Sequence, residues 1–174
     1  MAKILQIAQL GNKVLRARSK PVSKTGSDKG LMEDLMVTLK EVNGVGIAAP
    51  QVYESKRIFI IHSYPNPRYP KAPKFGPIAV INPEIISNSE AVVEDWEGCL
   101  SIPGIRALVP RYKEITVEYQ TREGKKERKK FKDFLARIFQ HELDHLNGLV
   151  YLDRIKSTKD IVTEKEFLRI ISKK

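Results

Sequence analysis

The stretch DFLARIFQHELDHLNG, residues 133–148, decides the fold. Its apolar side chains spread around most of a helical circumference, which predicts a helix that is buried on nearly every side. Asp133 is suited to cap its first turn, and Gly148 to take the left-handed conformation that ends a helix. Residues 141–145 of the same helix include two histidines and two carboxylates, and burying such groups is costly unless they have partners. We therefore expect a central helix with polar chemistry inside the protein.

The five residues HELDH, 141–145, indicate what that chemistry is. One helical turn separates His141 from His145, so both imidazoles project from one face toward a common point. This spacing suits a divalent metal and leaves Glu142 beside it to handle the protons of a water molecule. Two core histidines four residues apart are the alternative, which the intervening glutamate and the apolar surroundings disfavour. A catalytic centre of this kind takes a third protein ligand and keeps one position open.

Several residues compete for the place of the third ligand. A metzincin has its last histidine at the position that Tyr151 holds here, which removes that option. A thermolysin-like site takes a glutamate about twenty residues downstream of the helix, close to the spacing of Glu164 and Glu166, although both are also typical of solvated charges on a helix face. His62 ends an apolar run, and Cys99 is the only cysteine in the chain. A thiolate is a good ligand for zinc or ferrous iron.

Beyond this helix, the chain predicts an α+β fold. Leucines at helical spacing favour a helix over 28–43, with Asp28 as its cap and Gly44 as its stop. Strands are expected at 57–61, 78–81, 90–94 and 114–120, and an irregular, proline-rich loop at 63–77. We expect a single domain in which largely antiparallel β-sheets pack around the buried helix that carries HExxH.

The net charge of the 174 residues favours a polyanionic binding partner. A net charge of +10 and a pI near 9.7 favour RNA, and much of the excess lies in the runs 124–132 and 169–174. Each run is also explained as a solvated hairpin tip or a solvated tail. No motif that reads nucleic-acid bases accompanies the charge, so we expect no DNA partner.

Composition also bounds the location. No apolar stretch has the length needed to span a bilayer, and we expect no membrane partner. A single cysteine permits no internal disulfide, which fits a reducing compartment. The N-terminal stretch lacks the order of a secretory signal. The cytoplasm is the expected location, and an organelle is not excluded because that stretch is basic and free of acids.

Three separate stretches resemble the signature motifs of one family. GVGIAAPQ (44–51), EGCLS (97–101) and QHELDH (140–145) are similar to the three motifs of peptide deformylases, in the right order. The similarity extends from Ile4 to Ile155. The family often has proline before VLR near the N-terminus, where this chain has Lys13, and the tail follows no motif of the family. We therefore expect a catalytic domain over 1–155 and a basic, partly helical C-terminal segment over 156–174.

The resemblance implies an activity and a metal centre. The expected reaction removes the N-formyl group from the N-terminal methionine of newly synthesised polypeptides and releases formate. Cys99, His141 and His145 would hold one divalent ion, for which the family favours Fe²⁺, with Zn²⁺, Ni²⁺ or Co²⁺ able to fill the same ligands. Glu142 would act as general base and then general acid. The Gln51 side-chain amide and the Leu100 backbone N–H would stabilise the oxyanion.

The substrate is expected to lie between the helix and the first motif. The loop formed by Gly44, Val45 and Gly46 can approach an extended peptide and pair with it like an added strand. Ile138 and Phe134, one and two turns before His141, would line an apolar pocket for the methionine side chain, and simple core packing is the alternative for both. Arg106 is expected to contact the peptide backbone.

Two other functions compete with a deformylase. One is a metallopeptidase of the thermolysin type, which would not require a formyl group. The other is a basic RNA- or ribosome-binding module in which the helix holds only a structural zinc and nothing is hydrolysed. The enzymatic and the ribosome-binding functions are also compatible with each other. In that case, the enzyme associates with the ribosome through its basic surface and meets formyl-methionyl nascent peptides there.

Overall fold

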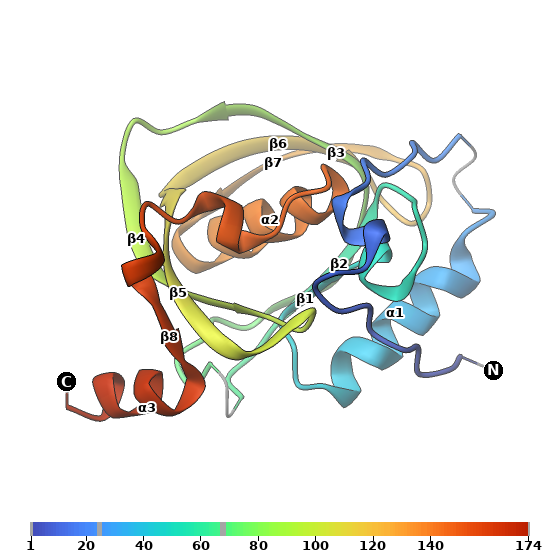
Figure 1. Ribbon diagram of the computed structural model, residues 1–174. Helices are drawn as coiled ribbons and strands as arrows, with labels where there is room; N and C mark the ends of the chain where they lie inside the picture. Colours follow the sequence, from blue (N-terminus) through green and yellow to red (C-terminus); the bar gives the residue numbers. More distant parts are fainter. Residues whose placement is uncertain (1, 24–25, 67–68, 174) are drawn as a thin grey trace.

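Two antiparallel sheets surround one helix in the computed structural model, which describes residues 2–23, 26–66 and 69–173 (Figure 1). The larger sheet has the order β1-β2-β3-β6-β7 and the smaller one β4-β5-β8. The strands of the larger sheet are β1 (Gly46–Ala48), β2 (Ile58–Ser63), β3 (Phe75–Asn88), β6 (Glu114–Gln120) and β7 (Lys126–Lys132). Those of the smaller sheet are β4 (Val92–Cys99), β5 (Ile102–Tyr112) and β8 (Ile161–Thr163). The helices are α1 (Lys29–Glu41), α2 (Asp133–Leu146) and α3 (Glu164–Ser172), and short 3₁₀ turns occupy Lys13–Arg16, Ala49–Val52, Tyr151–Arg154 and Thr158–Asp160.

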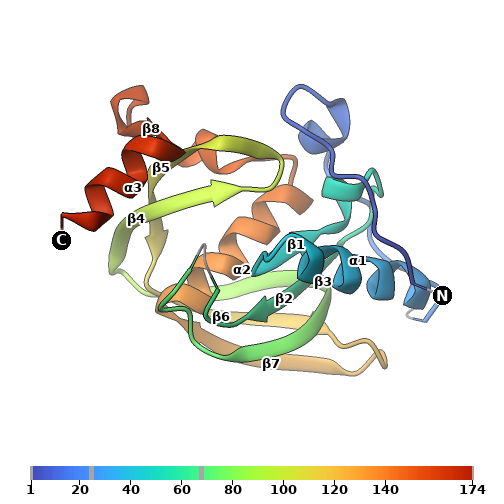
Figure 2. The ribbon, with the colours of Figure 1, turned by 90° about the horizontal axis from the view of Figure 1, so that it is seen from below.

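Helix α2 lies inside the space that the strands enclose, as the burial of its sequence predicted (Figures 1 and 2). Its Phe139 ring meets Phe59 of β2 edge-on with 5.0 Å between centroids and Phe131 of β7 with 5.4 Å. Burial of three aromatic rings in one contact is a large apolar contribution to the core. The α+β fold with a central buried helix is therefore confirmed.

Strand β2 is buried on both faces because a helix packs on each. Successive side chains of a strand point to opposite faces. Phe59 and Ile61 belong to the core around α2, whereas Ile58 and Ile60 pack with Leu35 of α1 in a second core. The continuous apolar run of this strand follows from that arrangement.

The helix ends differ in part from the sequence predictions. Asp133 does not cap α2: it is the first helical residue, with φ 50°, and Lys132 occupies the N-cap position. Gly148 does take the left-handed conformation at φ 77°, and its N–H donates to the His145 carbonyl. At α1, the Asp28 carboxylate is in an ion pair with Lys56 and makes no cap hydrogen bond. Asn43, with φ 51°, and not Gly44, has the left-handed backbone after α1.

Strand β3 is much longer than the four residues expected at 78–81. It starts at Phe75, inside the predicted proline-rich loop, and it includes the segment around Asn82 and Pro83 that has the composition of a turn. Register irregularities between Ile81 and Glu84 accommodate this segment within the sheet. The Asn82 side chain bonds to both the N–H and the carbonyl of Val22, which holds its φ of 50° in place. Strand β4 likewise lies later than expected, at 92–99.

The C-terminal segment is part of the folded body. Strand β8 pairs antiparallel with β5, from Ile105 opposite Thr163 to Ala107 opposite Ile161. Helix α3 follows directly and lies at the edge of the smaller sheet (Figure 2). None of the helices in the described part of the chain has both the length and the apolar content that crossing a membrane requires.

Candidate active site

The predicted metal ligands come together between α2 and the end of β4. Cys99 is the last residue of β4, and a register shift between Glu97 and Cys99 interrupts the pairing of this strand with β5. Its Sγ lies 3.2 Å from His145 Nε2. The ligand atoms of Cys99, His141 and His145 all lie within 4.8 Å of one another. Residues 42 positions apart in sequence thus meet at one point, as the three-ligand prediction requires.

The competing third ligands lie elsewhere. The Glu164 carboxylate accepts two hydrogen bonds from Arg106, at 2.8 and 3.0 Å, and Glu166 pairs with Arg169. The His62 ring packs against Tyr64. Within the described residues, these side chains are outside the cluster of potential ligands, so the thermolysin-like arrangement is not the one that this chain forms.

Glu97 contacts the Nδ1 side of the His141 ring, and its role was not predicted from the sequence. Its Oε2 lies 2.9 Å from His141 Nδ1, which leaves Nε2 of the ring to face the cluster. Its two oxygens also accept from Arg111, at 2.9 and 3.0 Å, and Oε1 accepts from Arg137 at 2.8 Å. Burial alone raises the pKa of Glu97, but Arg111 and His141 outweigh burial and hold this pKa well below its usual range. Glu97 is therefore a buried carboxylate that orients a histidine.

The thiol and the glutamate of the motif have opposite pKa shifts. Burial raises the pKa of Cys99, but the imidazoles of His145 and His141 lower it by more. The pKa of this thiol therefore falls well below its usual range. Burial dominates at Glu142 and raises its pKa to about 7. A pKa near neutrality suits a group that must both accept and return a proton.

Gln51 has a fixed amide orientation. Its Oε1 accepts the N–H of Ala48 at 2.8 Å, so the amide nitrogen must point the other way. Nε2 lies 3.5 Å from Cys99 Sγ and 3.2 Å from Ser101 Oγ. Leu100 sits in the turn between β4 and β5, where Cys99 pairs with Ile102, so its N–H is outside the strand ladder. Both groups thus offer donors next to the thiol.

One cavity connects these groups. It is lined by most of the predicted site residues and by two aromatic residues that the sequence analysis did not single out, Tyr69 and Trp96. The predicted residues on its wall are Gly44, Val45, Gly46, Gln51, Cys99, Leu100, Phe134, Ile138, His141 and Glu142. The same wall thus carries Cys99 and His141, which are two of the three potential ligands, together with the expected general base Glu142 and both apolar residues expected to hold methionine.

Gly46 and Glu142, which both line this cavity, lie in close contact. A Cβ at position 46 would collide with the Glu142 carboxyl group. Glycine is therefore required where β1 passes the glutamate, a reason that the sequence alone does not supply. Glu142 Oε2 is buried and has no hydrogen-bond partner among the described residues.

Arg106 is placed differently from the expectation. It is not on the wall of the cavity, and only 2% of its side chain is exposed. Its guanidinium is bonded to Glu164 and lies 3.4 Å from the Tyr69 hydroxyl. The guanidinium of Arg106 therefore bonds to other side chains of this protein, and Arg106 lies behind the residues that line the cavity.

The donor set fits a single divalent metal. One sulfur and two imidazole nitrogens within 4.8 Å of one another match the ligand preferences of zinc and ferrous iron. Glu142 lines the same cavity, and its Oε2 has no hydrogen-bond partner among the described residues, so the carboxyl group can serve as an acceptor for a water molecule. A buried HExxH helix with a thiolate from a neighbouring strand thus defines a metal-dependent hydrolase.

Comparison with known proteins identifies the family. A family model described as polypeptide deformylase matches residues 4–160. The chain is 49% identical to peptide deformylase 2 of Nostoc sp. over 173 residues, which is 98% of this chain and 97% of the relative. A class I type b peptide deformylase from Acinetobacter baumannii, solved with Met-Ala-Ser bound, has a TM-score of 0.85 and 42% identity, over 89% of this chain and all of that one. The Thermotoga maritima enzyme has a TM-score of 0.79 and 39% identity, over 88% and 99%.

The chain belongs to the peptide deformylase family. It is a metal-dependent hydrolase of the family that removes the N-formyl group from newly made polypeptides. The resemblance drawn from three short motifs is therefore confirmed over nearly the whole chain.

Proposed function

We propose that Cys99, His141 and His145 hold one Fe²⁺ ion and that deformylation takes place in the cavity above them. The observation that carries this proposal is the meeting of the three ligand atoms within 4.8 Å beside Glu142. Sulfur ligation and the family resemblance favour ferrous iron, and zinc, nickel or cobalt suit the same donors. When bound, the ion supplies Lewis acidity to the formyl carbonyl and to water.

The peptide is proposed to add to the free edge of β1. This strand ends the five-stranded sheet, so one side of Gly46–Ala48 has no neighbouring strand among the residues that the structure describes. An extended peptide can pair with such an edge. Phe134 and Ile138 then receive the methionine side chain, on the wall that also carries Val45. The related Acinetobacter baumannii enzyme was solved with Met-Ala-Ser bound, which supports a peptide with an N-terminal methionine as the ligand.

Glu142 is proposed to move the proton. Water attacks the formyl carbon while the Glu142 carboxylate removes its proton, and the C–N bond then breaks. The same proton passes from Glu142 to the departing amine nitrogen, which yields formate and a free N-terminus. The pKa of about 7 at Glu142, raised by burial, supports both halves of this transfer.

Gln51 and Leu100 are proposed to stabilise the oxyanion. The Gln51 Nε2 lies 3.5 Å from the Cys99 sulfur, and Leu100, whose N–H is outside the strand ladder, directly follows Cys99 in the chain. Because Ala48 fixes the amide of Gln51, this donor is oriented before the substrate arrives. Loss of one such donor costs about a hundred- to a thousandfold in turnover.

The test is release of formate from a formyl-Met peptide by anaerobically purified protein. Glu142→Gln should retain iron and lose nearly all turnover, whereas Cys99→Ala should lose the iron. Unimpaired turnover in Glu142→Gln, or full iron occupancy in Cys99→Ala, contradicts the assignment. Cleavage of an unformylated peptide bond at a comparable rate would favour a general metallopeptidase instead.

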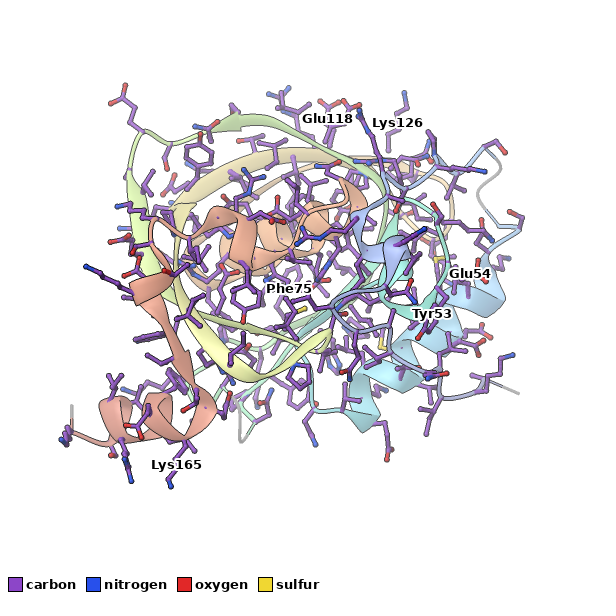
Figure 3. The ribbon with its side chains drawn as sticks, viewed as in Figure 1. Tyr53, Glu54, Phe75, Glu118, Lys126 and Lys165 are labelled. Carbon is purple, nitrogen blue, oxygen red and sulfur yellow. The ribbon has the colours of Figure 1, made fainter. Side chains whose placement is uncertain are left out.

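We further propose that α3 brings the enzyme to the ribosome, in the cytoplasm. Lys165 points away from the body of the protein (Figure 3). Lys173 directly follows α3 and is exposed. The lysines of β7 support this role less, because Lys130 and Lys132 both pair with Glu114.

Co-sedimentation with ribosomes at increasing salt tests this association. Deletion of 165–174 should weaken it, and so should Lys165→Glu with Lys173→Glu, which leaves the apolar side of α3 intact. An unchanged profile in both variants contradicts the association.

A further inference from the structure

Helix α3 is tied to the wall of the cavity through Arg106. The Arg106 guanidinium donates from Nε and Nη2 to the two Glu164 oxygens, at 2.8 and 3.0 Å, and from Nη1 to the Tyr69 hydroxyl at 3.4 Å. It lies between two rings, 4.9 Å from the centroid of Phe167 and 5.5 Å from that of Tyr69. The α3 residues Glu164 and Phe167 therefore hold one end of a contact whose other end, Tyr69, lines the cavity.

Gly98 makes this contact sterically feasible. A Cβ at position 98 would lie 2.8 Å from Arg106 Cδ and 2.9 Å from its Cζ. The Arg106 side chain thus passes directly behind a residue of the cavity wall. The glycine before the cysteine in EGCLS leaves room for the arginine.

A second contact joins α3 to the other aromatic residue of the wall. The Trp96 and Phe167 rings meet nearly edge-on, with centroids 5.6 Å apart. Phe167 is the buried residue of α3. Both Tyr69 and Trp96, the two aromatic residues on the cavity wall, are thus supported from the C-terminal helix.

The helix depends on these contacts in turn. Isolated helices of nine residues are marginal in water, so α3 keeps its place through tertiary packing. If Glu164 loses its charge, the buried Arg106 guanidinium loses its carboxylate partner, and an uncompensated buried charge rearranges its surroundings. The Tyr69 hydroxyl would then lose a fixed donor.

We propose that Glu164 and Phe167 are positioning residues for the substrate: by docking α3, they set the places of Tyr69 and Trp96 and thereby the affinity for the formyl-methionyl peptide. This inference rests on the proposed use of the cavity by the substrate. It gives the C-terminal segment 156–174 a part in the active site of the catalytic domain. Because neither residue contacts the reacting atoms, the chemical step itself stays intact.

The test compares Glu164→Gln with Glu166→Gln. Glu166 is on the same helix, is exposed, and pairs only with Arg169 in the described structure, so it is a matched control. We expect Glu164→Gln to raise KM for a formyl-Met tripeptide about five- to tenfold, with kcat and iron content as in the wild type, because ground-state and transition-state binding are lost together. Glu166→Gln should leave KM unchanged. Equal KM values in the two variants overturn the proposal.

Phe167→Leu gives a second, independent measurement. Trp96 is the only tryptophan in the chain, so its fluorescence reports on the contact with α3 without interference. We expect a shifted emission spectrum together with the same rise in KM. A shifted spectrum with a wild-type KM would show that the helix moves without effect on substrate, which overturns the proposal. Failure of the proposed function is distinct, because the wild-type enzyme would then release no formate.

Discussion

His141 Nδ1 lies 2.9 Å from Glu97 Oε2, and this contact joins the proposed metal centre to a buried chain of charges. Glu97 is bonded to Arg111, which donates in turn to Asp144 at 2.6 Å. Asp144 accepts from Arg154, whose side chain is 44% exposed. The chain of charges thus runs from the ligand, through β5 and back to α2, to the surface. It fixes the helix that carries the histidines to the sheet that carries the cysteine.

Glu97→Gln should weaken metal binding without removing a ligand. The amide retains a hydrogen-bonding oxygen but loses the charge that favours the ring orientation and basicity of His141. Changes of this kind cost about ten- to a hundredfold in metal affinity. Competition with a chelator of known affinity measures the loss. Glu94→Gln is the control, because Glu94 is an exposed residue of the same strand, paired with Lys156; a loss of the same size in both variants would contradict the role of Glu97.

Arg111→Met should destabilise the fold strongly. Arg111 and both its partners, Glu97 and Asp144, are nearly fully buried, with side chains 4–5% exposed. Its removal leaves two buried carboxylates without their shared cation, which costs about 3–5 kcal/mol in the free energy of unfolding. Urea denaturation of the metal-loaded protein measures it. Arg128→Met removes an exposed arginine 3.8 Å from Glu118 and should cost less than about 1 kcal/mol; similar losses in the two variants would contradict the structural role of the buried chain.

Local patterns predicted the elements whose sequence agrees with their surroundings. Helix α2 and strand β6 appeared at the expected places because their apolar spacing matches the faces that they bury. Strand β3 was underestimated because Asn82 and Pro83 favour a turn, whereas the side-chain bonds of Asn82 to Val22, 60 residues away, keep this segment within the sheet. No local pattern carries that information.

The residues of the site were likewise predicted only in part from the sequence. His141, Glu142 and His145 lie in one short motif, so their common helix face was predictable from spacing. Spacing left the third ligand open among Glu164, Glu166, His62 and Cys99, and the choice of Cys99 came from the resemblance to the family's motifs. Glu97 was missed because its three partners come from β5 and α2. A signal was present: Arg137 is a charged residue on a helix predicted to be buried, and such a residue needs an acid from elsewhere in the chain. Arg106 was expected to contact the peptide because no acidic partner for it is evident nearby in the sequence. Its partner, Glu164, lies 58 residues further along the chain.

Gly46→Ala should abolish activity while the metal stays bound. The added methyl group would collide with the Glu142 carboxyl, and either β1 or the proposed base must move. Displacements of about 1 Å at a reacting group cost about a hundredfold in rate. Formate release and iron content measured on the same sample separate the two effects.

Gly30→Ala is the matched control for this substitution. Gly30 lies in the first turn of α1, where an added Cβ would meet no atom within 4 Å apart from its chain neighbours and the backbone of its own helix, so alanine should leave activity unchanged. Full activity in Gly46→Ala would contradict the contact between β1 and Glu142.

Removal of the metal should lower both activity and thermal stability. A chelator is expected to abolish formate release, and Fe²⁺ added without oxygen to restore it. A ligand that binds only the folded state stabilises it by about 4 kcal/mol when its free concentration is about a thousand times Kd. Each kcal/mol shifts Tm by about 2–4 °C in a chain of this size. The melting temperature should therefore fall by about 10 °C on chelation.

Cys99→Ala separates this effect from a general action of the chelator. The variant lacks the sulfur ligand, so its Tm should already be low and should not respond to the chelator. Glu142→Gln retains all three ligands and should show the full wild-type shift although it is inactive. A chelator response in Cys99→Ala as large as that of the wild type would mean that the stabilising ion binds elsewhere, because the sulfur lies 3.2 Å from His145 Nε2 and contributes one of only three ligand atoms in the cluster.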